Sequence, residues 1–290
     1  MGVIRGRSLL AAVALLAATP AVAEPALWSV SDRDSTIYLF GTAHAARPGA
    51  QWKTPKIAAA MRAATDLWLE IGEDLGGDPS AMAAIVRRYG IDPARPLSKT
   101  LTPAQQARLA AVVQPYGMTM AQLEPMRPWL AAVTLGTLPF VKAGLDPAAG
   151  ADRTLRAVAV AEKDAIHGFE TPEQQIRFLA DFSEAEQIAF LDSAMKDAAE
   201  GPAELMALSD AWEKGDVARL SRLVIDEMRT GEPLLYRRLI VERNVAWAKA
   251  IREMLAGKGV AFVAVGVGHL VGPDSVQAQL AKAGVKARRR

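Results

Sequence analysis

Short apolar runs bounded by turn-forming residues predict a small β-sheet. Trp28–Ser31 and Thr36–Gly41 are rich in β-branched and aromatic residues, and Asp32–Ser35 between them favours a four-residue hairpin turn. Three later runs also predict strands, and the last is apolar throughout, as in a strand covered on both faces. These runs are Leu67–Ile71, Ala165–Glu170 and Val260–Val265.

Helix start signals occupy much of the remaining chain. Thr54, Thr102 and Thr171 each precede a proline, which suits an N-cap followed by proline at the first helical position. Thr102 and Thr171 also have a glutamine three residues later, and Ser183 has Glu186. The sequence therefore predicts three capping boxes.

These elements predict an α/β fold with a small central mixed sheet surrounded by many helices. The region of about residues 78–161 carries little strand signal and is expected to form a helical cap. A single domain is expected over residues 24–290. The basic tail Lys286–Arg290 is expected to be a frayed, solvated end.

The first 23 residues have the pattern of an export signal. Arg5 and Arg7 form a basic start, Ser8–Ala18 is apolar, and Ala21–Ala23 fits the A-x-A cleavage pattern before Glu24. The apolar run is too short to span a bilayer, although a membrane anchor is the alternative reading. We therefore expect a periplasmic or secreted protein without stable membrane insertion after signal cleavage.

Composition excludes several classes of function. Hydrophobic residues make up 51% of the chain and charged residues 23%, which is typical of a globular protein. The 34 basic side chains nearly balance the 32 acidic ones, so we expect no nucleic-acid partner. The absence of cysteine excludes disulfides, thiol catalysis and iron–sulfur clusters. Histidine chemistry can use only His44, His167 and His269.

Two of these histidines follow predicted strands in the same way. Gly41-Thr42-Ala43-His44 and Gly266-Val267-Gly268-His269 both read G-x-x-H. Glycine lets the backbone turn sharply and approach a ligand, and ligands of open α/β sheets bind at the carboxyl ends of the strands. The repeated placement favours one shared site that contains His44 and His269.

Two carboxylates occupy comparable positions. Glu70 lies inside an apolar strand, and Glu170 ends another. A buried carboxylate is unfavourable unless it is paired or bound to a metal. With the imidazoles of His44 and His269, these oxygens form a plausible ligand set for a divalent metal ion, with Zn, Mn or Co suiting it better than Mg. The alternative is a structural salt bridge.

Arg243 is the candidate partner for that salt bridge. The longest helix is expected from Pro233 to about Leu255, and Arg243 lies in the middle of its apolar face. A guanidinium that faces a core requires a carboxylate or an anionic ligand. His167 lies three positions before Glu170, on the opposite face of its strand, so a core or supporting role is favoured for it.

In their order along the chain, five motifs resemble those of the TraB/GumN family, which includes the Tiki-type proteins. The motifs are Tyr38–His44, Leu69-Glu70, Gly168–Gln175, Glu242–Asn244 with Trp247, and Val265–Gly272. The resemblance implies a fold similar to that of the erythromycin-esterase and ChaN proteins. Because Tiki-type members are metal-dependent proteases, it also implies that His44, His269, Glu70 and Glu170 are metal ligands or catalytic groups.

The leading functional hypothesis is an exported metal-dependent hydrolase that resembles a peptidase and acts on a peptide or small-molecule substrate. A divalent ion on His44, His269 and a glutamate would activate water, the other glutamate would act as base, and Arg243 would orient it or stabilise an oxyanion. Two alternatives use the same scaffold without catalysis. One is a periplasmic ligand-binding protein, and the other is an accessory factor in envelope or polysaccharide assembly.

Overall fold

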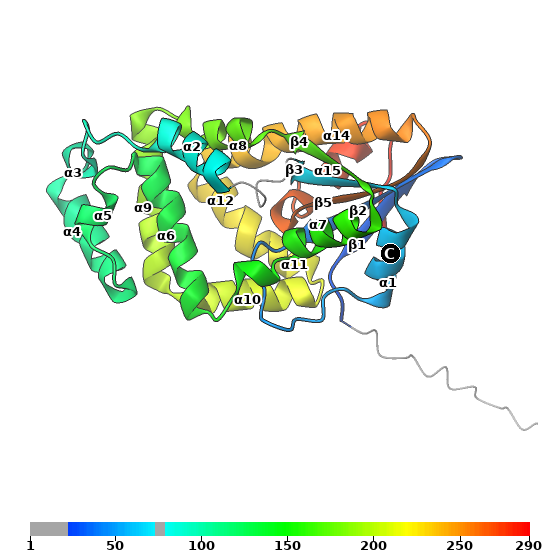
Figure 1. Ribbon diagram of the computed structural model, residues 1–290, viewed down its shortest axis with the longest axis horizontal. Helices are drawn as coiled ribbons and strands as arrows, with labels where there is room; N and C mark the ends of the chain where they lie inside the picture. Colours follow the sequence, from blue (N-terminus) through cyan, green and yellow to red (C-terminus); the bar gives the residue numbers. More distant parts are fainter. Residues whose placement is uncertain (1–22, 73–78) are drawn as a thin grey trace, which may run out of the picture.

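The computed structural model describes residues 23–72 and 79–290. A mixed six-stranded sheet occupies one end of the molecule, and helices surround it and extend away from it (Figure 1). The strand order is β4-β3-β5-β2-β1-β6. The strands are β1 Leu27–Ser31, β2 Ser35–Thr42, β3 Asp66–Ile71, β4 Ala165–Glu170, β5 Gly259–Gly266 and β6 Arg288–Arg289. This architecture confirms the predicted α/β class.

The four inner strands run in one direction. β5 pairs in parallel with both β2 and β3, and β3 pairs in parallel with β4. The pairs Thr42↔Gly266 and Ile71↔Glu170 therefore bring the ends of all four strands to one edge of the sheet. β1 and β6 add antiparallel strands on the β2 side.

Helices account for most of the chain outside the sheet. The α-helices are α1 Pro55–Ala63, α2 Pro79–Gly90, α3 Leu97–Thr100, α4 Pro103–Val113, α5 Met120–Leu123, α6 Pro128–Lys142, α7 Ala151–Glu162, α8 Pro172–Ala180, α9 Glu184–Glu200, α10 Pro202–Glu213, α11 Val217–Leu220, α12 Glu227–Gly231, α13 Pro233–Tyr236, α14 Glu242–Leu255 and α15 Val276–Lys282. Short 3₁₀ turns are η1 Gln114–Tyr116, η2 Pro147–Ala149 and η5 Val267–Leu270, while η3 Ser221–Asp226 and η4 Arg237–Val241 are π-helical.

Both faces of the sheet are covered. Phe40 and Phe262 belong to an apolar cluster on one face, while their strand neighbours Leu39 and Val263 belong to a cluster on the other, with Trp247 of α14. Alternate residues of β2 and β5 therefore point into different cores, which explains why Val260–Val265 is apolar throughout. A third cluster joins α3, α4, α6 and α9 away from the sheet.

The predicted helix caps are present. Thr54 accepts a hydrogen bond from the Ile57 amide, and Thr102, Thr171 and Ser183 each form a capping box. Within the expected helical cap region, α6 packs against α9, whereas α7 contributes buried residues to the core under the sheet.

Two local expectations require correction. The C-terminal tail is not frayed, because Arg288–Arg289 pair with β1 and the Arg289 guanidinium lies over the Trp28 ring, 5.0 Å from its centre. The helical run that begins at Pro233 contains the π-helical turn η4 before α14. The predicted signal peptide lies outside the described residues except for Ala23, and within those residues no helix is long and apolar enough to cross a membrane.

Candidate functional site

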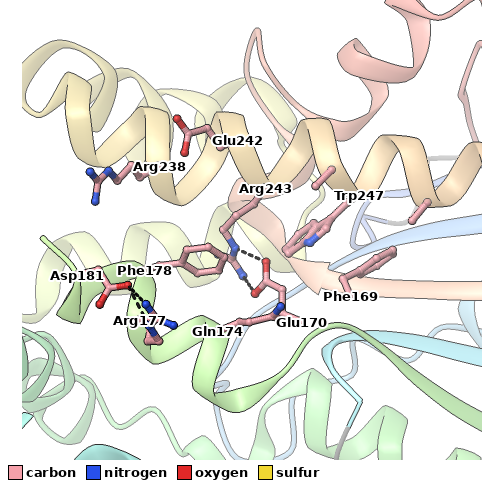
Figure 2. A pocket seen from close by; sticks show the side chains of 12 residues that line it. Phe169, Glu170, Gln174, Arg177, Phe178, Asp181, Arg238, Glu242, Arg243 and Trp247 are labelled. Carbon is pink, nitrogen blue, oxygen red and sulfur yellow. Dashed lines mark hydrogen bonds and ion pairs between the residues drawn. The ribbon is translucent and has the colours of Figure 1, made fainter. Parts of the chain in front are cut away.

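Arg243 joins the two candidate carboxylates. Its Nε and Nη2 donate to Glu170 at 2.7 and 2.8 Å (Figure 2), and Nη2 also donates to Glu70 at 2.7 Å. The three side chains are 9%, 6% and 13% exposed for Arg243, Glu170 and Glu70. Burial would lower the pKa of Arg243, but the two carboxylates raise it, so the guanidinium stays charged. The predicted salt bridge is therefore present, and it contains both glutamates.

Glu70 is the most highly coordinated carboxylate of this site. Its Oε1 accepts from the Gly266 amide at 2.8 Å, and its Oε2 accepts from Gln175 at 3.1 Å as well as from Arg243. Burial would raise the pKa of Glu70, but the positive charges around it and the amide hydrogen bond lower the pKa to about 2. Glu170 has fewer such partners, and burial raises its pKa above the usual value against the opposing effect of Arg243.

The helix that carries Arg243 has the predicted buried face. Ile240, Arg243, Trp247 and Ile251 are all buried. The guanidinium lies over the Trp247 ring, 4.7 Å from its centre, and over the Phe178 ring at 5.4 Å. These rings fix the guanidinium plane, so its donors can fork onto the carboxylates.

His269 is held between α14 and the sheet. Its Nδ1 lies 2.7 Å from Asn244 Oδ1, and Asn244 in turn donates its amide hydrogen to Asp274 O at 2.8 Å. Asn244 Oδ1 must therefore accept, so His269 carries its proton on Nδ1 and presents the Nε2 lone pair to Arg243 Nη1 at 3.1 Å. Burial lowers the pKa of His269 to about 4, so the ring is neutral at pH 7.

His44 occupies the opposite kind of environment. Its side chain is 72% exposed, and its Nδ1 lies 2.9 Å from Asp152 Oδ2 on the first turn of α7. The hydrogen bond with Asp152 raises the pKa of His44 to about 9. Nε2 is left to face the site.

The two imidazoles approach each other across Gly266. A Cβ added to Gly266 would lie 3.1 Å from Glu70 Oε1, 3.7 Å from His44 Nε2 and 3.8 Å from His269 Cδ2. Glu70 Oε1 is also 3.9 Å from His269 Nε2. The structure thus brings His44, Glu70, Glu170, Arg243 and His269 together at the carboxyl edge of the sheet.

His167 is not part of this cluster. Its Nε2 lies 2.8 Å from Asp66 Oδ1, and its ring stacks on Trp68 with 4.6 Å between ring centres. The side chain is on the other face of β4 from Glu170, as the three-residue spacing predicts.

The donor set fits a metal ion only in part. Both imidazoles have Nδ1 fixed by an acceptor, which is the arrangement that orients histidine ligands in metal sites, and both rings lie beside Gly266 near Glu70 Oε1. However, Arg243 already contacts Glu70, Glu170 and His269. In residues 23–72 and 79–290, no group of three or more acidic or histidine side chains is arranged to hold a metal. Glu170, forked onto Arg243 through both oxygens, is the least available ligand.

Two cavities border the cluster. One of about 650 Å³ lies between α8 and α14 and is lined by Glu170, Arg243 and the rings of Phe169, Phe178 and Trp247 among others (Figure 2). The other, of about 260 Å³, is lined by His44, Glu70, Asp152, Arg156 and Gln175 among others. Gln174 lines the first and its neighbour Gln175 lines the second, so the first turn of α8 lies between the two.

Sequence reasoning missed the residues that support this cluster. Asp152, Gln175 and Asn244 each hold one member of it. Gln175 and Asn244 lie inside motifs on which the family resemblance rests, so their position was a usable signal. Nothing local marks Asp152.

Comparison with known proteins identifies the relatives of the chain. A protein of Treponema pallidum (strain Nichols) described as an uncharacterized protein is 24% identical over 267 residues, which cover 87% of this chain and 79% of that protein. No solved structure matches. The sequence model of the TraB/PrgY/gumN family matches residues 26–289, almost the whole length. The chain therefore belongs to the TraB/PrgY/gumN family.

Proposed function

We propose that the protein is an exported, metal-dependent hydrolase that resembles a peptidase. The observation that carries the proposal is the matched orientation of His44 and His269. Each ring has Nδ1 fixed by an acceptor, Asp152 or Asn244, and each ring approaches Glu70 Oε1 around Gly266. A purely structural pair of strand-end histidines does not require this convergence.

His44, His269 and Glu70 are the proposed ligands. Within residues 23–72 and 79–290, Glu70 Oε1 accepts a hydrogen bond only from the Gly266 amide, which leaves its second lone pair for a metal ion. A divalent ion bound there would supply Lewis acidity, lowering the pKa of a water molecule and polarising a carbonyl group. His44 must lose its ring proton to act as a ligand, and its Nδ1–H would then donate to Asp152.

The remaining groups have the chemistry for proton transfer and charge stabilisation. Glu170 borders the larger cavity, and its raised pKa suits a general base that takes a proton from water and returns it to a leaving amine. Arg243 donates the hydrogen bonds that fix Glu170, and its positive charge would stabilise the negative charge that forms on a substrate carbonyl oxygen bound beside it.

The test combines metal binding with a peptide-cleavage screen. Wild type, H44A, H269A and H167A are compared for bound metal, for thermal melting with and without Zn, Mn or Co, and for cleavage of a broad peptide library. We expect metal to raise the melting temperature of wild type and H167A only, because a ligand bound to the native state stabilises it by mass action. Cleavage should follow the same pattern. Identical melting of all four proteins with and without metal would refute the metal site.

A second candidate function is ligand binding without catalysis. The way that Arg243 occupies both carboxylates and contacts His269 favours it. In that case H44A and H269A would lose no metal affinity, and no peptide in the library would be cleaved.

A further inference from the structure

The cavity between α8 and α14 has two chemically different ends. Along its upper wall, the lining residues change from charged to apolar in chain order (Figure 2). The order is Arg238, Glu242, Arg243, Ala246, Trp247 and Ala250. The opposite wall follows the same division, with Arg177 and Asp181 at the charged end and Phe169 at the apolar end.

Arg238 is the cation at this cavity that forms no salt bridge among the described residues. Asp181 is paired with Arg177, Glu242 with Arg237, and Glu170 with Arg243. Arg238 stacks over the Phe182 ring at 4.9 Å, and in the part of the chain that the structure describes it makes no ion pair with a carboxylate. The nearby Glu186 accepts from the Ser183 amide, and Arg238 acts on it only as a nearby positive charge that helps to lower its pKa. This end of the cavity is therefore suited to an anionic group.

The π-helical turn places Arg238 in this position. Residues five apart lie above one another in a turn closed by i→i+5 hydrogen bonds, whereas an α-helix rotates them to different faces. Because η4 covers Arg237–Val241, Arg238 faces the same cavity as Arg243.

The other end offers an aromatic surface. Phe169 and Trp247 stack with 5.2 Å between their ring centres, and Ala246 and Ala250 leave space beside them. Aromatic side chains bind other rings and bulky apolar groups through large contact areas. Arg238 and Ala250 are about 18 Å apart along the helical run, which is about the length of five extended peptide residues.

We propose that this cavity binds an extended peptide segment of about five residues, with an acidic side chain at Arg238 and a bulky apolar side chain at Phe169 and Trp247. The middle of the segment then lies against Glu170 and Arg243. This inference rests on the proposed function only in treating the peptide as the substrate.

The experiment measures binding in the presence of a chelator, so that cleavage does not interfere. The ligands are capped pentapeptides with Asp at one end, Phe at the other and Ala between them, in both orders, together with the same peptides carrying Asn for Asp. Isothermal titration calorimetry gives each Kd. We expect one order to bind, and its Asp form to bind about tenfold more tightly than its Asn form because a charged hydrogen bond is lost.

Two variants and two matched controls locate the site. Arg238→Gln should abolish the difference between the Asp and Asn peptides, whereas Arg252→Gln, at an exposed position of α14 outside the cavity lining, should preserve it. Ala250→Trp should fill the apolar end and abolish binding, whereas Val245→Trp, on the exposed side of α14, should not. Melting temperatures verify that each variant folds.

Several outcomes would overturn the proposal. These are no saturable binding of any peptide, equal affinity of wild type for the Asp and Asn forms, or unchanged binding to Ala250→Trp. Selective binding without cleavage after metal is added would refute the hydrolase but leave this site intact. Cleavage without selective binding would refute this peptide site but leave the proposed hydrolase intact.

Discussion

The two G-x-x-H segments have the same pattern and opposite chemistry. His44 follows β2, is mostly exposed, and has a pKa raised to about 9 by its hydrogen bond with Asp152. His269 follows β5, is buried beside Arg243, and has a pKa lowered to about 4. The strand-end pattern therefore fixes where an imidazole lies, and the groups that pack around it decide whether it carries a charge.

The largest expected effect comes from removing the charge that both carboxylates share. Arg243→Ala leaves Glu70 and Glu170 buried without a cation, so we expect a loss of about 3–5 kcal/mol in the free energy of unfolding, measured by denaturant titration. Arg237→Ala is the exposed control and should change stability by less than about 0.5 kcal/mol. Near-equal losses for the two variants would mean that the Arg243 cluster contributes little to folding.

Acidification should lower the free energy of unfolding through the two buried groups His269 and Glu70. The native state holds His269 neutral, with a pKa of about 4 against an ordinary 6.5. The contribution of His269 to the free energy of unfolding is therefore complete above pH 6.5 and is lost as the pH falls toward 4. Glu70, with a pKa of about 2 against 4.5, loses its contribution between pH 4.5 and 2.

Denaturant titrations across this range measure the effect. The loss due to His269 should be on the order of 3 kcal/mol, and His269→Gln should remove the part between pH 6.5 and 4. If His269→Gln lost as much stability as wild type between pH 6.5 and 4, His269 would not be a buried, neutral imidazole in the native state.

Asn244 connects His269 to the backbone, and its removal should have an intermediate effect. Asn244→Ala leaves the Nδ1–H of His269 without its partner and removes one of the two donors to the Asp274 carbonyl, so we expect a loss of about 2 kcal/mol. The Nδ1 proton should also become mobile, which imidazole ¹⁵N shifts would detect. A variant that keeps both stability and tautomer would show that Arg243 alone orients the ring.

The smallest effect is expected at the exposed histidine. His44 has a raised pKa, so its contribution to the free energy of unfolding is fully present below pH 6.5 and is lost as the pH rises through about 9. Because the pair is exposed, Asp152→Asn should change stability by less than about 0.5 kcal/mol. It should also lower the pKa of His44 in an NMR titration, by about one unit for each 1.4 kcal/mol of stability lost. An unchanged pKa of His44 in this variant would show that Asp152 does not raise it.

The parts that sequence could predict are those governed by local periodicity. The inner strands, the capping boxes and the buried face of the helix that carries Arg243 follow from spacing along the chain. Because parallel strands end at one edge, the convergence of His44, Glu70 and His269 follows as well. Asp152 and the pairing of β6 depend on contacts between distant segments. The π-helical turn depends on packing along its helix, so spacing alone does not reveal it.

The strand order has a consequence for when the protein can fold. β5 lies between β2 and β3, yet it begins at Gly259, after almost nine-tenths of the chain. Until that segment is available, β3 and β2 have no common neighbour, and the edges that they present to β5 remain unpaired. Such long-range pairing delays folding, so a nascent chain should stay unfolded until its synthesis is nearly complete. Protease resistance that appeared in chains truncated before β5 would disprove this.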